Sequence, residues 1–328
     1  MNSFGRIFRL SVFGESHGPM IGVVMDGVMP GLTISADDFS EDLQRRRGGV
    51  QPGTTSRQEP DVPNFLSGVF NGKTTGAPLT IAFENTDTKS KDYELQKNIP
   101  RPGHADFTAA MKFKGFQDYR GSGHFSGRLT ALLVAAGVVA KKMIGHHHPQ
   151  LLISSKILSL GGNENAEEAI ALAIKNQDSI GGVIQCRLQH VPIGLGEPFF
   201  DSFESVVSHL VFSIPAVKAI EFGAGFAAAK MKGSEHNDAL MNANGITETN
   251  HAGGINGGIS NGNEIVFRIA VKPTSSTPQQ QTSYNFTSGK SEEFQVKGRH
   301  DLCIALRVPV VLEAVAAIAL TDLLLLNR

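Results

Sequence analysis

Two long apolar segments constrain the fold of this chain more than any other feature. Residues 129–140 are almost entirely apolar, and residues 308–326 form a longer apolar run that contains Glu313 and Asp322. A helix needs about 20 residues to cross a bilayer, so the first run is too short. The two carboxylates argue against a membrane span in the second. We therefore expect both segments to be helices buried inside a soluble protein.

The segments expected to form strands alternate apolar and polar residues. In residues 184–189 every second side chain is apolar, and the same pattern recurs in residues 265–271. Strands that are apolar on one side are typical of sheets covered on one face, which are often antiparallel. A β-branched, glycine-containing run predicts another strand over residues 21–27. Long helices mixed with such strands indicate an α+β fold with layered helices and sheets.

Capping residues and helix breakers delimit the expected helices. Asn165 is a good N-cap residue, Gly145 is a breaker, and Ser35 begins a capping-box pattern. These signals predict helices over residues 36–47, 129–144, 166–175, 202–212 and 310–326. The polar stretch 274–291 is expected to be a surface loop. Because no linker or internal repeat divides the sequence, we expect one domain over residues 1–328.

Charge and cysteine content exclude several classes of function. The net charge of −1 gives no indication of binding to nucleic acid or to a membrane surface. Cys186 and Cys303 lie in apolar patterns, so we expect free thiols in a reducing compartment. Residues 1–6 lead into an alternating pattern and not into the apolar core of a signal peptide. We therefore expect a soluble, cytoplasmic protein.

The segment Gly14-Glu15-Ser16-His17-Gly18 fits two kinds of chemistry. As G-x-S-x-G it matches the nucleophile elbow of serine hydrolases, which needs a sheet formed earlier in the chain and a helix directly afterwards. Only 13 residues precede Gly14, and a strand-like run follows. We therefore reject the hydrolase, for which fluorophosphonate labelling of Ser16 would be the test. The segment instead presents His17 as an acid or base beside a hydroxyl group.

Arginine, histidine and serine recur next to glycine in five separate parts of the chain. These parts are residues 14–18, 45–49, 101–106, 120–128, and 250–276 with 297–301. Arginine pairs with carboxylate or phosphate oxygens two at a time, so the set predicts a small ligand with several negative charges. The glycine-rich turn at residues 121–126 precedes an expected helix, whose free N–H groups favour phosphate. Residues 146–148, three histidines, have no cysteine or carboxylate partner at metal-ligand spacing, so we expect a surface linker and no metal.

Together these segments resemble the chorismate synthase family over nearly the whole chain. The matching motifs, in a highly specific order, are GESHG (14–18), DGVMPG (26–31), RRR (45–47), RPGHAD (101–106), DYRG (118–121), NHAGGINGGIS (250–260), KPTSS (272–276) and GRHD (298–301). The resemblance implies a β-α-β sandwich of the chorismate synthase type, with helices layered between largely antiparallel sheets. It also implies a homotetramer.

The resemblance further implies the reaction and its cofactor. Chorismate synthase eliminates phosphate and a ring hydrogen from 5-enolpyruvylshikimate-3-phosphate, and it needs reduced FMN without net redox change. That substrate carries two carboxylates and a phosphate, as the arginines require. FMN and NADP are associated with this family. A flavin reductase domain takes about 100 residues or more, which this chain does not have to spare, so we expect an external source of reduced flavin.

The motif positions imply roles for individual residues. His17, with Ser16 beside it, matches the acid that protonates the departing phosphate. His104 matches the histidine that manages the proton on reduced flavin, and Asp301 matches the carboxylate that helps flavin N5 take the ring hydrogen. The anion-binding positions are Arg46, Arg101, Arg128 and Arg299. The flavin-binding positions are His124, Phe125, Ser126, Ala216, Gly257, Lys272, Pro273, Thr274, Ser275, Ser276 and Arg299.

Two departures from the family pattern leave an alternative open. Where the family often reads GGGRSSARET, this chain has GSGHFSGRLT at residues 121–130, and Phe125 could lie near the flavin ring system. Pro52 stands where an arginine is frequent, and Arg57 is a candidate replacement. The alternative is a flavin- or phosphate-binding homologue that has lost catalysis. The joint presence of His17, His104 and Asp301 favours the enzyme.

Overall fold

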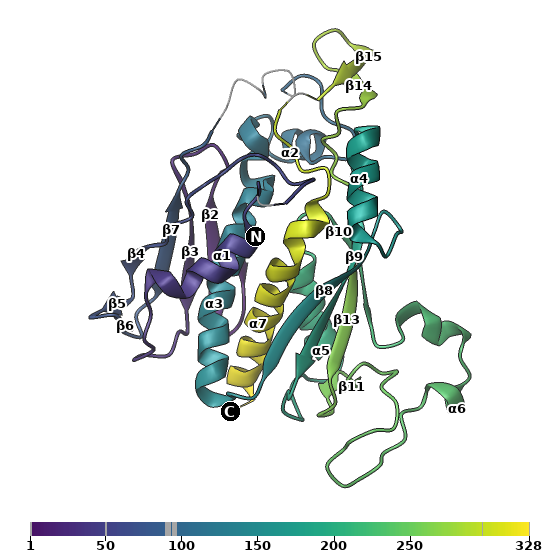
Figure 1. Ribbon diagram of the computed structural model, residues 1–328. Coiled ribbons are helices and arrows are strands. Elements are labelled where there is room, and N and C mark those ends of the chain that lie inside the picture. The colour runs from purple at the N-terminus through teal and green to yellow at the C-terminus, as the bar shows by residue number, and fades with distance from the viewer. Residues whose placement is uncertain (1, 50, 89–92, 94–96, 297, 328) are drawn as a thin grey trace.

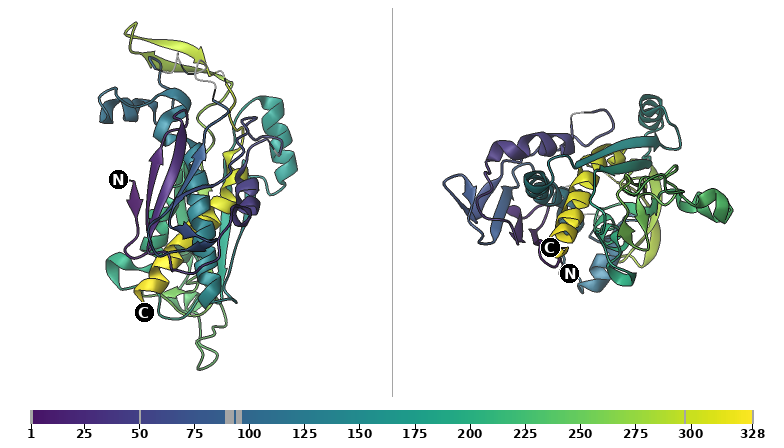
Figure 2. Two further views of the ribbon diagram at one scale, coloured as in Figure 1. Left: turned by 90° about the vertical axis from the view of Figure 1, so that its left-hand side faces the viewer. Right: turned by 90° about the horizontal axis from the view of Figure 1, so that it is seen from below.

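The protein consists of two antiparallel sheets with two long helices between them. The computed structural model describes residues 2–49, 51–88, 93, 97–296 and 298–327. Figure 1 shows the first sheet on the left, α3 and α7 in the centre, and the second sheet on the right. Seen from below in Figure 2, the helices separate the two sheets. The α+β layering expected from the sequence is therefore confirmed.

The first sheet is built mainly from the N-terminal quarter of the chain. Its strand order is β1-β2-β3-β7-β4, and every pairing is antiparallel. The strands are β1 (Ser3–Phe4), β2 (Arg9–Gly14), β3 (Met20–Asp26), β7 (Leu79–Glu84) and β4 (Asn64–Ser67). The strand predicted over residues 21–27 is β3, whose partner β2 ends directly before the Ser16–His17 turn.

The second sheet contains the alternating segments that the sequence indicated. Its order is β10-β13-β9-β8, again antiparallel. The strands are β8 (Leu152–Leu160), β9 (Gly182–Gln189), β10 (Val217–Phe222) and β13 (Ile265–Val271). In β13 the side chains at alternate positions are buried, which places its apolar face on the helices.

The helices α3 (Thr130–His147) and α7 (Val308–Leu326) form the central layer. Both are long and apolar enough to cross a membrane, but 67% and 83% of their most apolar windows are buried inside the protein. They cross closely at Gly137, where an added Cβ would lie 2.3 Å from the Ala314 Cβ. Core residues from both sheets pack against this pair.

Smaller elements surround the layers. The remaining helices are α1 (Ser40–Arg46), α2 (Asp106–Lys112), α4 (Ala166–Asn176), α5 (Phe203–Val211) and α6 (Gly233–His236). The 3-10 turns are η1 (Ala36–Phe39), η3 (Arg120–Phe125), η4 (Gly127–Leu129), η5 (Phe199–Asp201), η6 (Gly225–Lys230) and η7 (Ile304–Arg307). The two-stranded ribbons pair β5 (Val69–Phe70) with β6 (Lys73–Thr74), β11 (Ile255–Asn256) with β12 (Ile259–Ser260), and β14 (Gln280–Asn285) with β15 (Lys290–Gln295).

The prediction that Gly145 ends the first long helix is wrong. The helix α3 continues to His147, so His146 and His147 form its last turn and are not a linker. A single glycine costs a helix about 1 kcal/mol, which the burial of Met143 and Ile144 offsets. The helix ends where Pro149 approaches, because the residue before a proline disfavours helical geometry.

The prediction of a loop over residues 274–291 is wrong for its second half. Residues 280–295 form the β14–β15 ribbon at the top of Figure 1. Both faces of β14 are polar or partly exposed, so its sequence lacks the hydrophobic alternation of a half-buried strand. Two hydrogen bonds fix the ribbon to the chain before α2: Ser283 Oγ donates to the Pro100 carbonyl, and the Phe286 N–H donates to that of Asn98.

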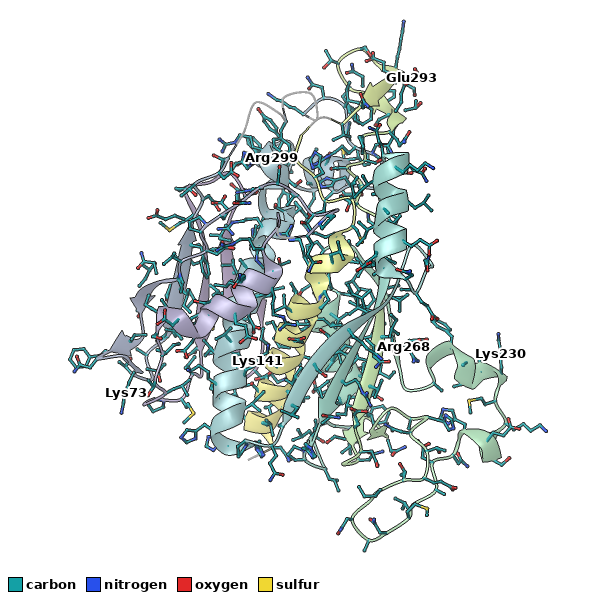
Figure 3. The ribbon with its side chains drawn as sticks, in the orientation of Figure 1. Lys73, Lys141, Lys230, Arg268, Glu293 and Arg299 are labelled. Atoms are coloured by element: carbon teal, nitrogen blue, oxygen red, sulfur yellow. The ribbon has the colours of Figure 1, made fainter. Side chains whose placement is uncertain are left out.

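Buried carboxylates on α7 connect it to both ends of the molecule. Glu313 accepts two hydrogen bonds of 2.8 Å from Arg45 on α1 and one of 2.7 Å from Ser155 on β8. Lys141, labelled beside α3 in Figure 3, lies 3.5 Å from the same carboxylate. At the other end of α7, Asp322 accepts the backbone N–H groups of residues 6, 7 and 8 at 2.9, 2.8 and 2.9 Å.

We expect Asp322→Asn to lower the free energy of unfolding by about 2–4 kcal/mol. The amide keeps the shape of the side chain but turns an NH2 group toward backbone N–H groups and removes a charge-assisted acceptor. Asp201→Asn is the matched control, because Asp201 pairs with exposed Arg6 in the same region and exposed pairs contribute little. Urea denaturation of both variants measures the difference. Equal stabilities would contradict the assigned role of Asp322.

Candidate active site

A cationic cleft of about 600 Å³ lies at the N-terminal ends of α3 and α7. Val12 on β2 lines it together with residues from the loops, turns and helix termini between the layers. Among the described residues that line it, cationic side chains outnumber the carboxylates Glu59 and Asp301, and they are Arg46, Arg47, Arg57, Arg101, Arg128, Lys272, Arg299 and Arg307. Figure 3 shows Arg299 at this end of the molecule. Such a lining suits a multiply anionic ligand.

A second hollow of about 760 Å³ lies elsewhere, between the N-terminal strands, η5, α5 and the end of α7. Among the described residues that line it, none is a candidate catalytic, substrate-binding or flavin-binding residue predicted from the sequence. The candidate site is therefore the cationic cleft.

The Ser16–His17 turn connects two adjacent strands, as expected when the hydrolase elbow was rejected. Ser16 is fully buried, and its backbone N–H donates to the Gly123 carbonyl at 3.1 Å. Its hydroxyl accepts a 2.7 Å hydrogen bond from Arg57. Gly121 packs so tightly on this turn that an added Cβ would lie 2.4 Å from the His17 ring. Its φ of +56° also favours glycine.

The charges around His17 oppose its protonation in the ligand-free protein. Burial is the largest cause that lowers the pKa of His17, and the positive charges of Arg57, Arg120 and Arg299 lower it further. Asp118 acts in the opposite direction. The imidazole is therefore mainly neutral at neutral pH, and an arriving anion would favour the protonated form.

Asp61 holds two buried arginines of the cleft. Its carboxylate is inaccessible to solvent and pairs with Arg46 at 2.8 Å and with Arg128. Burial would raise the pKa of Asp61, but these two arginines lower it, so the carboxylate is ionised. Burial lowers the pKa of Arg46 to about 10, against the effect of Asp61, and the guanidinium stays charged at neutral pH.

Arg46 retains hydrogen-bonding capacity after this pairing. Among the described side chains, its Nε and Nη1 are buried nitrogen atoms without a hydrogen-bond partner. Buried donors are nearly always paired in folded proteins, so unpaired ones in a cleft indicate a ligand acceptor. An anionic oxygen supplied by a ligand fits this position.

His104 belongs to a connected group with Arg101, Asp106 and Ser122. Asp106 Oδ1 lies 2.6 Å from His104 Nδ1, and Arg101 pairs with the same carboxylate through Nε at 2.7 Å and Nη2 at 2.8 Å. Ser122 Oγ lies 3.2 Å from His104 Nε2. Burial lowers the pKa of His104, Asp106 opposes this effect, and the charge of Arg101 adds to it.

Asp301 and Arg299 are fixed by separate contacts. The Thr55 N–H and Arg307 Nη1 donate to the Asp301 carboxylate at 2.9 and 3.0 Å. Arg307 Nε also donates to the Arg46 carbonyl at 2.8 Å. Arg299 donates to Asp87 at 2.6 and 2.9 Å. The Thr55 hydroxyl donates to the Arg299 carbonyl at 2.9 Å, so hydrogen bonds through Thr55 and Arg307 connect Asp301 with Arg299 and with Arg46.

Most of the expected flavin-binding positions also line the cleft. The ones that do are His124, Phe125, Ser126, Ala216, Lys272, Thr274, Ser275, Ser276 and Arg299. Ser276 accepts a 2.8 Å hydrogen bond from Arg101, and Ser275 accepts one of 2.6 Å from Lys272. Pro273 is outside the lining.

Gly257 is not brought to the cleft. It lies in the turn between β11 and β12, which Figure 1 shows at the other end of the molecule from β14 and β15. Lys297, part of one motif segment, lies outside the described residues.

In the loop of residues 121–126, whose sequence departs from the family pattern, His124 and Phe125 have different roles. His124 Nδ1 lies 2.8 Å from the Gly14 carbonyl and Nε2 lies 3.1 Å from Asn2 Oδ1, so this ring fixes the loop to the first sheet. Phe125 is 41% exposed and packs near Phe113 at a centroid distance of 6.2 Å. Phe125 is thus the side chain of this loop with apolar surface available in the cleft.

Sequence reasoning missed several residues that hold the site together. Asp61, Glu59 and Arg307 act by pairing with candidate residues, and an isolated charged residue outside the motifs gives no signal of that. Asp106 stands in the RPGHAD motif, but no role was predicted for it. Arg57 was noted only as a replacement for the arginine absent at Pro52, and it does line the cleft. Ser122 had one available signal, a serine between two glycines of a phosphate-type turn.

The comparisons with known proteins agree with the motif pattern. A family model described as chorismate synthase matches residues 8–325. The chain is 60% identical over 328 residues to the chorismate synthase of Chitinophaga pinensis, covering 100% of this chain and 98% of that protein. It is 42% identical over 351 residues to that of Christiangramia forsetii, covering 100% and 98%.

A solved structure gives the same result. The fold matches a crystal structure of chorismate synthase with a TM-score of 0.74 and 26% sequence identity, covering 99% of this chain and 93% of that one. Family model, relatives and fold therefore agree over nearly the full length. The chain belongs to the chorismate synthase family.

Proposed function

We propose that this protein is a chorismate synthase that converts 5-enolpyruvylshikimate-3-phosphate to chorismate, with reduced FMN as cofactor. The observation that carries the proposal is Arg46, a buried guanidinium held by Asp61 with two unpaired nitrogens in a cationic cleft. A substrate with a phosphate and two carboxylates supplies the oxygens that this cleft lacks. A cofactor-binding protein without catalysis would need the anion site but not the acid-base residues around it.

The arginines bind and orient the substrate. Arg46 and Arg128 share Asp61, so their guanidinium planes are held before the ligand arrives. Preorganised donors of this kind stabilise developing negative charge more effectively than mobile ones. Arg57 lies beside Ser16, where it compensates for the arginine that Pro52 replaces.

His17 is the acid for the departing phosphate. It starts neutral because burial and three arginines lower its pKa, and the negative charge of bound phosphate raises its affinity for a proton. The proton at this ring then neutralises charge on the leaving oxygen. The tight contact with Gly121 keeps the imidazole in place.

The residues around Lys272–Ser276 and Arg299 would hold the flavin, whose reduced ring supplies electron density as the C–O bond breaks. Asp301 assists removal of the hydrogen from the substrate ring. Its carboxylate is oriented by Thr55 and Arg307. His104 exchanges the proton on the reduced flavin. The reduced flavin comes from an external source. NADP enters only as the reductant of that source.

The family resemblance also motivates a proposal for the assembly and the location of the protein. We place the protein in the cytoplasm as a homotetramer, which is consistent with exposed phenylalanines at residues 116, 199, 200 and 226 that association would cover. Sedimentation velocity tests the assembly, and a stable monomer at micromolar concentration would contradict it.

We expect His17→Ala and Asp301→Asn each to lower kcat by about 10²-fold or more, because each removes a proton-handling or orienting group. The assay is anaerobic, with photoreduced FMN and 5-enolpyruvylshikimate-3-phosphate, and follows chorismate absorbance. Binding of FMN is measured in parallel and should persist in both variants. His146→Ala, at the exposed end of α3, is the control and should retain full activity. Absence of chorismate with the unmodified protein would favour the non-catalytic homologue.

We expect two substitutions to shift the pKa of His17 in opposite directions. Arg57→Gln removes a positive charge and raises this pKa, whereas Asp118→Asn removes a negative charge and lowers it. NMR titration of the His17 Cε1–H signal in the ligand-free protein measures both shifts. Arg187→Gln, which breaks an exposed pair with Glu264, should leave the titration unchanged. Shifts of the same sign in the two site variants would refute this account of the His17 environment.

A further inference from the structure

We propose that the Ser122 hydroxyl is the group through which His104 exchanges a proton with the ligand in the cleft. This inference rests on the proposed function, since it concerns the same cleft. It adds a residue that the motif pattern does not assign, at a position where the family often has glycine.

Both ring nitrogens of His104 are already engaged within the protein. Nδ1 lies 2.6 Å from Asp106 Oδ1 and Nε2 lies 3.2 Å from Ser122 Oγ. Burial would raise the pKa of Asp106, but hydrogen bonds from Arg101 and His104 lower it well below its usual range. An ionised carboxylate only accepts, so Nδ1 carries the ring proton and Nε2 accepts from Ser122. A proton that passes between this imidazole and the cleft therefore travels through Ser122 Oγ.

The backbone of Ser122 is held in a conformation that serine rarely adopts. Its φ is +69°, between Gly121 at +56° and Gly123 at +50°. A left-handed conformation costs a non-glycine residue about 1–2 kcal/mol, and strain of this kind concentrates at functional sites. Glycine would fit this backbone without strain. The serine therefore contributes a side chain at a measurable conformational cost.

The surroundings of Ser122 suit proton transfer. Its Oγ accepts a 3.1 Å hydrogen bond from Arg101 Nη2, and the residue lines the cleft. The same arginine is paired with Asp106 and with Ser276, so its position is fixed. Positive charge at the oxygen stabilises the serine as its own proton leaves.

The transfer balances without a further reactant. A proton from an N–H or O–H group of the ligand bonds to Ser122 Oγ as the original Oγ proton passes to His104 Nε2. Serine ends neutral, imidazole becomes imidazolium, and the ligand gains one negative charge beside Arg101 and Lys272. Asp106 stays ionised and stabilises the imidazolium, as the aspartate of a Ser-His-Asp array does. The reverse step returns the proton.

Two substitutions separate the hydroxyl from the backbone. Ser122→Ala removes the hydroxyl and keeps both the Cβ and the strained φ, so we expect kcat to fall by about 10²-fold with KM within about twofold. Ser122→Gly removes the Cβ as well and leaves room for a water molecule beside Nε2, so we expect it to recover much of that loss. Gln177→Gly is the control, because it relieves a φ of +50° at a residue outside the cleft lining and should leave kcat unchanged.

An NMR measurement on the ligand-free protein tests the hydrogen bond independently of activity. The ¹⁵N signal of His104 Nε2 should move in Ser122→Ala, where the donor is lost, and stay in place in Gln177→Gly. Wild-type kcat in Ser122→Ala, or an unmoved Nε2 signal, would overturn the proposal. If the unmodified protein forms no chorismate, the proposed function fails, and the NMR comparison alone then supports or refutes the Ser122–His104 link.

Discussion

The ion pairs of Asp61 with Arg46 and Arg128 are the interaction on which the site depends. The cleft gathers many cations, and without a buried anion their mutual repulsion and desolvation would oppose folding. The fully buried Asp61 carboxylate compensates the charge of both arginines. It leaves Nε and Nη1 of Arg46 available to a ligand. Asp61 reaches this position from a left-handed backbone with φ of +52°, which aspartate tolerates better than most residues. The binding charge of the site is thus built into the core and is not added at its surface.

The same principle extends to three other proposed functional side chains of the site, each of which is held by a charged partner. Asp106 orients His104, Arg307 orients Asp301, and Arg57 contacts Ser16. The three pairs lie in separate segments of the chain, so their relative positions depend on the spacing of the two sheets. That spacing is set by α3 and α7, which touch at Gly137 and Ala314. Packing in the middle of the molecule therefore determines distances at its end.

The fold was largely predictable because its main elements carry periodic patterns. The strand β13 alternates cleanly, α4 begins at its predicted cap Asn165, and α7 is apolar over nearly its whole length. The ribbon β14–β15 was missed because its strands bury no apolar face. Motif likeness singled out His17, His104 and Asp301 as candidates, but it gave no sign of Asp61, because a pairing between residues distant in sequence leaves no local pattern. Gly257 shows that motif likeness can also mislead: it matches a flavin-binding position of the family but does not line the cleft.

The position of α7 in sequence has a consequence for biosynthesis. This helix follows every strand of both sheets along the chain, yet it lies between them, and Asp322 near its end secures the segment before β2. Because translation runs from the N-terminus, the sheets emerge from the ribosome before the helix that covers their inner faces. Their inner apolar surfaces therefore stay uncovered until α7 has been synthesised after them. Until α7 is made, these faces are open to association with other chains.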